Sequence, residues 1–178
     1  SRGIDPESPL LGIVPGAGYG TAKMWPSEYF ARAGDTLARM LDARPIIFAE
    51  AKDAPVAGEI AAKMSRAPLD MSGEGSGPGG VGRLKQLMGR CALVLTTDSG
   101  PRHVAAALGT PVVVVMGSAD PLYSTTGHRH VFVQRVPVDC SPCMLRECPT
   151  DHRCMTQLKP EQVVDAAMRL LGECGASD

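Results

Sequence analysis

The stretch Thr96–His103 has the residue types of an anion-binding turn. It places Asp-Ser-Gly at positions 98–100, between two apolar runs that are typical of strands, Ala92–Leu95 and Val112–Met116. Such a turn opens a helix at the carboxyl end of a buried strand, where unpaired N–H groups and the positive end of the helix dipole point outward. A phosphate or diphosphate binds well there, whereas the Asp98 carboxylate repels phosphate and suits sugar hydroxyls. The turn therefore indicates a ligand with both groups, such as a nucleotide sugar.

An ordinary helix cap is the alternative interpretation of the same residues. Asp98 or Ser99 can accept hydrogen bonds from N–H groups of the first helical turn and so cap the helix without any ligand. The turn alone favours neither interpretation, and the rest of the chain has to separate them.

Length and composition indicate one α/β domain with an aliphatic core. The chain has 178 residues, of which 44% are hydrophobic and only 4% aromatic. Lys and Arg number 18 against 19 Asp and Glu, a net charge of −1, so a nucleic-acid partner is not expected. No apolar run approaches the length of a membrane span, and the polar, Pro-containing start has no signal-peptide pattern. We therefore expect a cytoplasmic protein.

Apolar runs alternate with helical patterns along the chain. The expected strands are Leu10–Val14, Pro45–Phe48, Pro68–Met71, Ala92–Leu95, Val112–Met116 and Val131–Val133, and the expected helices start near Pro26 and Asp53 or span Arg83–Arg90 and Pro160–Leu171. Continuous apolar strands between helices predict a Rossmann-like parallel sheet with helices on both faces. Ligands of such sheets bind beyond the carboxyl ends of the strands.

The loop Gly16–Lys23 follows the first expected strand and is rich in glycine. It is not a dinucleotide fingerprint, because Thr21 stands where the third glycine belongs, and it is not a Walker loop, because Lys23 follows Ala22. Its glycines let the backbone approach a ligand closely, and Lys23 could neutralise a diphosphate. A flexible loop with a solvated lysine is the alternative. Trp25 is expected to be a buried anchor at the helix start.

Several sequence blocks together resemble the heptosyltransferase family, the ADP-heptose:lipopolysaccharide glycosyltransferases. They are Pro15-Gly16-Ala17, Lys-x-Trp-Pro at 23–26, Asp-Ser-Gly-x-x-His at 98–103, Gly109-x-Pro111 and Gly117-x-x-x-Pro121. Their order and separation are similar to those of the C-terminal half of these enzymes, over nearly the whole chain. The resemblance implies a two-domain GT-B enzyme of lipopolysaccharide biosynthesis, in which this half has a Rossmann-like fold and binds the sugar nucleotide.

The resemblance also implies a division of labour between two halves. Residues 1–178 would form the donor-binding domain, while the acceptor-binding N-terminal domain and its general base would lie outside this chain. We expect the chain alone to bind ADP-heptose but not to transfer the sugar. The family implies inversion at the anomeric carbon and a lipid-linked core saccharide as acceptor at the inner membrane face. The whole protein would then be cytoplasmic, with peripheral membrane contact at most.

Site roles carry over from the family by position. Lys23 would bind the diphosphate and stabilise the leaving nucleotide, and Asp98 would contact the sugar, which makes these two the expected catalytic residues. The remaining expected ligand contacts are Gly16, Gly18 and Tyr19 in the phosphate-contacting loop, Asp53 toward the ribose, Ser99 and Gly100 as backbone donors, and His103. A lysine and a helix N-terminus can stabilise the leaving group without a metal, so no cofactor is expected to be required. His103 has a structural role as its alternative.

One segment departs from the family pattern. Where the family carries a Leu-bearing helix start near the nucleobase, Met71–Gly80 is rich in glycine. The identity of the base is therefore left open by the sequence.

Four of the six cysteines cluster near the C-terminal end of the chain. Cys140, Cys143, Cys148 and Cys154 include one Cys-x2-Cys pair, and four thiolates suit tetrahedral zinc. A structural zinc site is one expectation for them. Free thiols, disulfides formed after purification and a Cys-bearing loop without a metal are the alternatives.

Three classes of function remain open at this stage. The first is the donor half of an inverting glycosyltransferase that uses ADP-heptose or another sugar nucleotide. The second is a nucleotide-binding module without transferase activity. The third is a small redox or metal protein built around the cysteines, which would leave the Lys-x-Trp-Pro block unexplained.

Overall fold

A computed structural model describes residues 7–75, 79–124 and 127–175 of the chain. The described residues contain a six-stranded sheet in the order β3-β2-β1-β4-β5-β6, and every neighbouring pair is parallel. This is the doubly wound order of Rossmann-like folds, so the predicted fold class is confirmed. The strands are β1 (Leu10–Val14), β2 (Arg44–Ile47), β3 (Leu69–Asp70), β4 (Cys91–Thr97), β5 (Val112–Val115) and β6 (Val131–Gln134).

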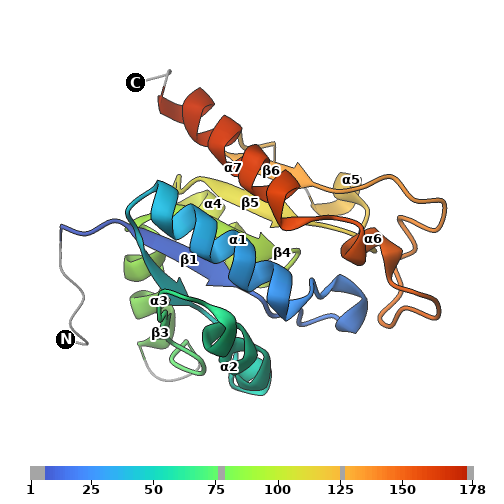
Figure 1. Ribbon diagram of the computed structural model, residues 1–178, viewed down its shortest axis with the longest axis horizontal. Coiled ribbons are helices and arrows are strands. Elements are labelled where there is room, and N and C mark those ends of the chain that lie inside the picture. The colour runs from blue at the N-terminus through green and yellow to red at the C-terminus, as the bar shows by residue number, and fades with distance from the viewer. Residues whose placement is uncertain (1–6, 76–78, 125–126, 176–178) are drawn as a thin grey trace.

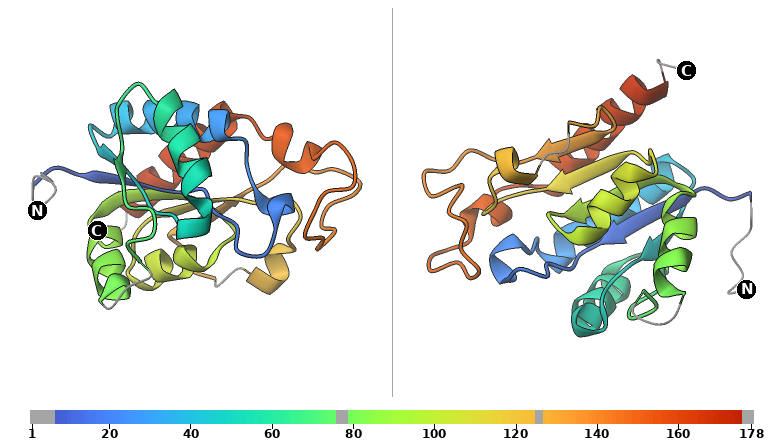
Figure 2. Two further views of the ribbon diagram at one scale, coloured as in Figure 1. Left: turned by 90° about the horizontal axis from the view of Figure 1, so that it is seen from below. Right: turned by 180° about the vertical axis from the view of Figure 1, so that it is seen from behind.

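The helices follow the strands as expected for crossover connections. They are α1 (Ser27–Met40), α2 (Ala54–Lys63), α3 (Gly80–Met88), α4 (Gly100–Ala107), α5 (Pro121–Ser124), α6 (Arg153–Thr156) and α7 (Pro160–Gly175), with short 3-10 turns η1 (Thr21–Lys23) and η2 (Ala51–Asp53). Helices α1, α2 and α7 cover one face of the sheet, seen in front in Figure 1, and α3 and α4 cover the other, seen from behind in Figure 2.

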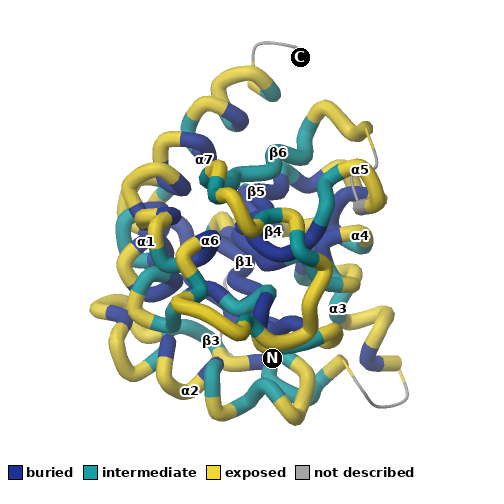
Figure 3. Tube along the Cα trace, turned by 90° about the vertical axis from the view of Figure 1, so that its right-hand side faces the viewer, coloured by how far each residue is buried: buried dark blue, intermediate teal, exposed yellow. Residues whose placement is uncertain are grey.

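Each face of the sheet has its own core, because successive strand residues point to opposite faces. Leu11 and Ile13 of β1 pack toward α1, while Leu10 and Val14 pack toward the face with α3 and α4. Strands buried on both faces must be apolar throughout, which explains the unbroken run Val112–Val115. Figure 3 shows the result, a buried sheet inside a shell of exposed helix surfaces and loops.

The expected anchor at the start of α1 is confirmed. Trp25 is only 2% exposed and packs edge-on against Tyr29 and Phe30. Its indole N–H donates to the backbone oxygen of Leu158, 2.9 Å away, just before α7. This hydrogen bond ties the loop after β1 to the C-terminal helix.

The parallel arrangement brings the functional loops to one edge of the sheet. The chain runs outward from β1 to β3 and then returns to β4, beside β1, before it continues to β6. The carboxyl ends of β1 and β4 therefore flank the topological switch point, where ligands of such sheets bind. The loops Gly16–Lys23 and 98–103 begin at these two ends.

Candidate functional site

The two loops at the switch point are joined directly. Thr97, the last residue of β4, donates its hydroxyl to the backbone oxygen of Gly16 over 2.6 Å, in a fully buried position. Thr96 and Ser99 pair their hydroxyls at 3.3 Å within the second loop. The backbone of both loops is thereby fixed where a ligand would meet it.

The N-terminus of α4 faces open space and lacks a side-chain cap. Ser99 is the N-cap residue in extended conformation, yet neither its hydroxyl nor another side chain caps the helix. A Cβ atom built on Gly100 would meet nothing within 4 Å. The ordinary-cap interpretation is therefore wrong, and Ser99, Gly100 and Pro101 at the start of α4 line the cavity described below.

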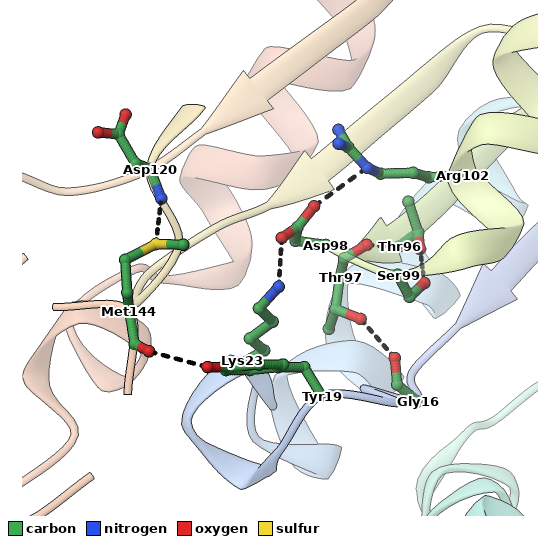
Figure 4. Close-up of polar contacts among 10 residues, drawn as sticks. All are labelled: Gly16, Tyr19, Lys23, Thr96, Thr97, Asp98, Ser99, Arg102, Asp120 and Met144. Atoms are coloured by element: carbon green, nitrogen blue, oxygen red, sulfur yellow. Dashed lines mark hydrogen bonds and ion pairs between the residues drawn. The ribbon is translucent and has the colours of Figure 1, made fainter. Parts of the chain in front are cut away.

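Asp98 does not cap α4 because two cations bind its carboxylate (Figure 4). Lys23 Nζ lies 2.6 Å from Asp98 Oδ2, and Arg102 Nε lies 3.1 Å from Asp98 Oδ1. The Asp98 side chain is 8% exposed, and the side chains of Lys23 and Arg102 are 15% and 3% exposed. We call Lys23, Asp98 and Arg102 the ion triad. With two cations and one carboxylate, the ion triad has a net charge of one positive unit, which suits an anionic ligand.

A cavity of about 270 Å³ lies at the same edge of the sheet. Its apolar lining comes from β1, from the residues just after β2 and β3, and from α3, while its charged lining consists of Glu50, Asp53, Glu74 and Arg83. The lining residues are Val14, Gly16, Gly18, Phe48, Ala49, Glu50, Asp53, Met71, Glu74, Gly75, Gly80, Arg83, Leu84, Leu87, Ser99, Gly100 and Pro101. The glycine-rich segment after Met71 thus forms part of the wall, apart from residues 76–78, which lie outside the described part of the chain.

The structure divides the expected ligand residues into two groups. Gly16, Gly18, Asp53, Ser99 and Gly100 line the cavity. The other four, Tyr19, Lys23, Asp98 and His103, lie beside the cavity and do not line it. Lys23 lies in the same loop as Gly16 and Gly18, and Asp98 directly precedes Ser99. The ion pair between Lys23 and Asp98 therefore joins the two loops that line the cavity.

Asp53 is held close to the loop backbone. A Cβ atom on Gly16 would lie 2.3 Å from Asp53 Oδ2, so a larger residue at this position would have to displace the carboxylate. Burial raises the pKa of Asp53, the neighbouring Lys52 lowers it, and Glu50 raises it again. A desolvated carboxylate of this kind suits a hydrogen bond from a hydroxyl group.

His103 stands one residue beyond Arg102 in α4 and is exposed. Burial lowers its pKa from 6.5, the positive charge of Arg102 lowers it further, and Asp98 opposes both effects. The imidazole is therefore neutral at pH 7, able to donate or accept a hydrogen bond without adding charge to the triad.

A segment of irregular backbone between β6 and α6 supports the first loop. Arg146 donates to the backbone oxygen of Tyr19 over 2.9 Å and accepts at its own backbone oxygen from the Ala22 N–H, also at 2.9 Å. The hydroxyl of Tyr19 donates to the backbone oxygen of Met144 (Figure 4), and both Lys23 and Arg146 lie over the tyrosine ring. The segment also binds the loop after β5, because Cys143 and Met144 donate to the backbone oxygen of Ser118.

The four clustered cysteines lie in and just after this segment and surround a small cavity of about 70 Å³. All four are free thiols: Cys140 is exposed, Cys143 and Cys148 are half-buried, and Cys154 is buried. Burial and the three neighbouring thiols raise the pKa of Cys154 to about 11.

The expected zinc site is not supported. Across residues 7–75, 79–124 and 127–175, no group of three or more His, Cys, Asp or Glu side chains is arranged to hold a metal ion. Two nearby groups have other partners, since His152 Nε2 lies 2.9 Å from the Ala22 backbone oxygen and Cys148 Sγ lies 3.5 Å from Thr150 Oγ1.

Sequence reasoning missed three parts of the site. Arg102 gave no signal, because an arginine in the first turn of a helix is ordinarily solvent-exposed. Glu74 and Arg83 form an ion pair at the cavity wall, across a glycine-rich stretch without periodicity. The hydrogen bond from Arg146 to Tyr19, which supports the first loop, joins residues 127 positions apart, and no local sequence pattern indicates it.

Fold and site together define a doubly wound α/β domain with a cavity at its switch point, and the start of α4 forms part of the cavity wall. The comparisons with known proteins are more specific. The sequence model of glycosyltransferase family 9 (heptosyltransferase) matches residues 2–153, so the chain belongs to this family.

Curated relatives agree with the family match. The chain is 31% identical over 166 residues to lipooligosaccharide heptosyltransferase 2 of Campylobacter jejuni, covering 91% of this chain and 51% of the relative. It is 27% identical over 173 residues to lipopolysaccharide heptosyltransferase 2 of Salmonella typhimurium, covering 97% and 49%. The chain thus spans about half the length of the relatives it matches.

A solved structure shows the same fold. The structure of E. coli ADP-heptose lps heptosyltransferase II is similar with a TM-score of 0.78 and 26% identity, over 97% of this chain and 49% of that one.

Proposed function

We propose that this chain is the donor-binding half of an inverting glycosyltransferase that transfers heptose from ADP-heptose to a lipopolysaccharide core acceptor. The observation that carries the proposal is the cavity at the switch point, whose lining combines apolar side chains with Ser99 and Gly100 at the start of α4, a helix without a side-chain cap. Family membership supports the reaction class. The acceptor-binding half and the general base would belong to the remainder of a longer protein.

The cavity offers one wall for each part of a sugar nucleotide. Phe48, Met71, Leu84 and Leu87 provide an apolar wall for the base, and Asp53 lies where a ribose hydroxyl could donate to its carboxylate. The diphosphate would meet Gly16, Gly18 and the first N–H groups of α4. In this arrangement the sugar would extend beyond the cavity lining toward Asp98, the neighbour of Ser99.

The chemistry follows from the charges beside the cavity. Glycosyl transfer builds negative charge on the departing diphosphate and positive charge on the sugar. Lys23 and the positive end of α4 would stabilise the first charge, and the Asp98 carboxylate would stabilise the second and bind sugar hydroxyls. With the acceptor hydroxyl attacking from the opposite side, the anomeric configuration inverts.

Location follows from the same family assignment. Within the described residues, none of the helices has the length and apolar character that crossing a bilayer requires. We propose a cytoplasmic protein whose missing half reaches the lipid-linked acceptor at the inner membrane face.

Isothermal titration calorimetry of this chain with ADP, UDP and GDP tests the proposal. We expect selective ADP binding that is lost or weakened at least tenfold in Lys23→Ala, since one charge-assisted contact to phosphate contributes about 1.5–3 kcal/mol. Lys63→Ala, which removes an exposed lysine at the far end of α2, is the matched control and should bind like the parent. A preference for UDP or GDP would change the sugar nucleotide, and no binding to any of the three would overturn the proposed site.

Transfer assays on the full-length protein separate the transferase from the rival binding module. Selective ADP binding without heptose transfer in the full-length protein would favour a module that binds a nucleotide without catalysis. Transfer that disappears in Asp98→Ala would support the proposed role of the carboxylate.

A further inference from the structure

The ion triad contains a cation that the proposed donor contacts do not use. Arg102 is 2% exposed and does not line the cavity, yet its Nε lies 3.1 Å from Asp98 Oδ1. Lys23 occupies the other oxygen of the same carboxylate (Figure 4). The spacing of four residues between Asp98 and Arg102 lets the first turn of α4 carry this contact.

Burial makes the ion pair between Arg102 and Asp98 costly to break. An arginine stays protonated in proteins, and a buried charge without a partner is strongly destabilising. Asp98 is the carboxylate that the structure places against this guanidinium. The carboxylate is likewise nearly buried, so it too needs a partner that does not leave.

Lys23 is the partner that must leave. In the structure its ammonium group is bound to Asp98 Oδ2, whereas the proposed donor requires it at the diphosphate. If Lys23 were the only cation at Asp98, its departure would leave a buried carboxylate unpaired, and Asp98 would compete with the phosphate for the lysine. With Arg102 present, the carboxylate keeps a partner when Lys23 moves.

We propose that Arg102 is a positioning residue that holds Asp98 and thereby frees Lys23 to bind the donor diphosphate. This role rests on the proposed function and extends it to a residue that touches no part of the donor. Arg102 acts through Asp98: it stays paired with the carboxylate that would meet the sugar, so that Lys23 can leave that carboxylate.

Calorimetry with ADP on a set of variants tests the role. Arg102→Met, which keeps side-chain length without charge, should weaken ADP binding about tenfold or more, because Lys23 then becomes the sole partner of a buried carboxylate. Arg102→Lys, which restores a cation, should recover most of the affinity. Arg39→Met, at an exposed position of α1, is the control and should bind like the parent.

Two double variants distinguish this role from simple damage to the fold. In the Lys23→Ala background, Arg102→Met should have little further effect on ADP affinity. Lys23, the cation that Arg102 is proposed to free, is already absent there. Asp98→Asn combined with Arg102→Met should restore much of the affinity lost in Arg102→Met alone, since a neutral amide no longer holds Lys23. This double variant removes the buried cation and the buried carboxylate together, so it tests the proposal even if Arg102→Met alone fails to fold.

A readout without ligand checks the charge of Arg102 directly. Removing it should raise the pKa of His103, followed by NMR titration of the imidazole, because Arg102 lowers that pKa in the parent.

The outcomes separate the two proposals. If the parent binds none of the three nucleotides, the proposed function fails and the positioning role fails with it. If the parent binds ADP but Arg102→Met binds equally well, only the positioning role is overturned. A loss in Arg102→Met that persists undiminished with Lys23→Ala or Asp98→Asn would also overturn it.

Discussion

At the scale of single residues, the site depends on close approaches that only certain side chains allow. Gly16 accepts a hydrogen bond from Thr97 at its backbone oxygen and has the Asp53 carboxylate against its Cα. A side chain there would displace either the carboxylate or the loop. The absence of a side chain at Gly16 therefore leaves the space that the Asp53 carboxylate occupies.

Two glycine substitutions separate crowding from flexibility. Gly16→Ala should weaken ADP binding several-fold, because its Cβ would lie 2.3 Å from Asp53 Oδ2 and push the carboxylate away. Gly58→Ala, inside α2 with nothing within 4 Å of the new methyl group, should instead raise stability by about 0.5–1 kcal/mol and leave binding unchanged. Calorimetry and urea unfolding measure the two effects. Equal ADP affinity in Gly16→Ala and the parent would contradict the role of Asp53.

Asp53 should show a conflict between stability and binding. Since burial raises its pKa above 3.8, the folded state holds the proton more tightly than the unfolded state, and stability falls as pH rises above that value. Asp53→Asn should therefore be more stable than the parent at pH 7, with the difference shrinking as pH falls toward 3.8, while its ADP affinity drops. Urea unfolding at several pH values measures the first effect. A pH-independent difference would show that ionisation of Asp53 is not its cause.

At the scale of elements, the loop after β1 is held by a segment that has no regular structure. The contacts from Tyr19 and Ala22 to Arg146 tie a glycine-rich loop to backbone more than 100 residues later. Such a loop would otherwise have little local stability. The segment around Arg146 therefore contributes to the geometry of the loop Gly16–Lys23 without lining the cavity.

Gly20→Ala should release this support. Its Cβ would lie 2.2 Å from the Arg146 backbone oxygen, so the two segments must separate. We expect faster hydrogen exchange of the Ala22 amide, which donates to that oxygen, and weaker ADP binding. Gly18→Ala is the control for exchange, because the nearest atom to its new methyl group is the flexible Lys52 Nζ at 3.8 Å. Unchanged protection of Ala22 in Gly20→Ala would contradict the proposed support.

The elements themselves could be predicted from the sequence because their signals are local. Unbroken apolar runs such as Val112–Val115 identify strands buried on both faces, and Pro26 and Pro160 stand where helices begin. Arg102 could not be predicted, since its burial depends on a carboxylate that the fold, not the helix pattern, places against it. The zinc expectation failed for a related reason: the spacing of cysteines does not determine whether their sulfur atoms converge on one point.

At the scale of the whole molecule, a buried thiol and an exposed thiol should differ in how they report on folding. Cys91 is buried on the face with α3 and α4, and burial raises its pKa to about 12. Cys140, in the segment between β6 and α6, is exposed. Because the thiolate is the reactive form, these two cysteines should differ strongly in reactivity while the protein is folded.

Alkylation at pH 8 should follow that order. We expect Cys140 to react well before Cys91, and Cys91 to react only through global unfolding, so the rate at Cys91 should rise steeply with urea. Mass spectrometry of the labelled peptides measures both rates. In denaturing urea all six thiols should react at similar rates, which is the internal control. Fast labelling of Cys91 without urea would show that the sheet opens locally at β4.

The bond from Trp25 to Leu158 has a further consequence for the limits of the folding unit. The family match ends at residue 153, before α7, yet the indole at the start of α1 finds its acceptor at Leu158, and Val163, Ala167 and Leu170 of α7 complete the core on that face. A chain shortened to the matched segment would leave this core open to water. The part of the sequence that identifies the family is therefore shorter than the part that must be present for the domain to fold.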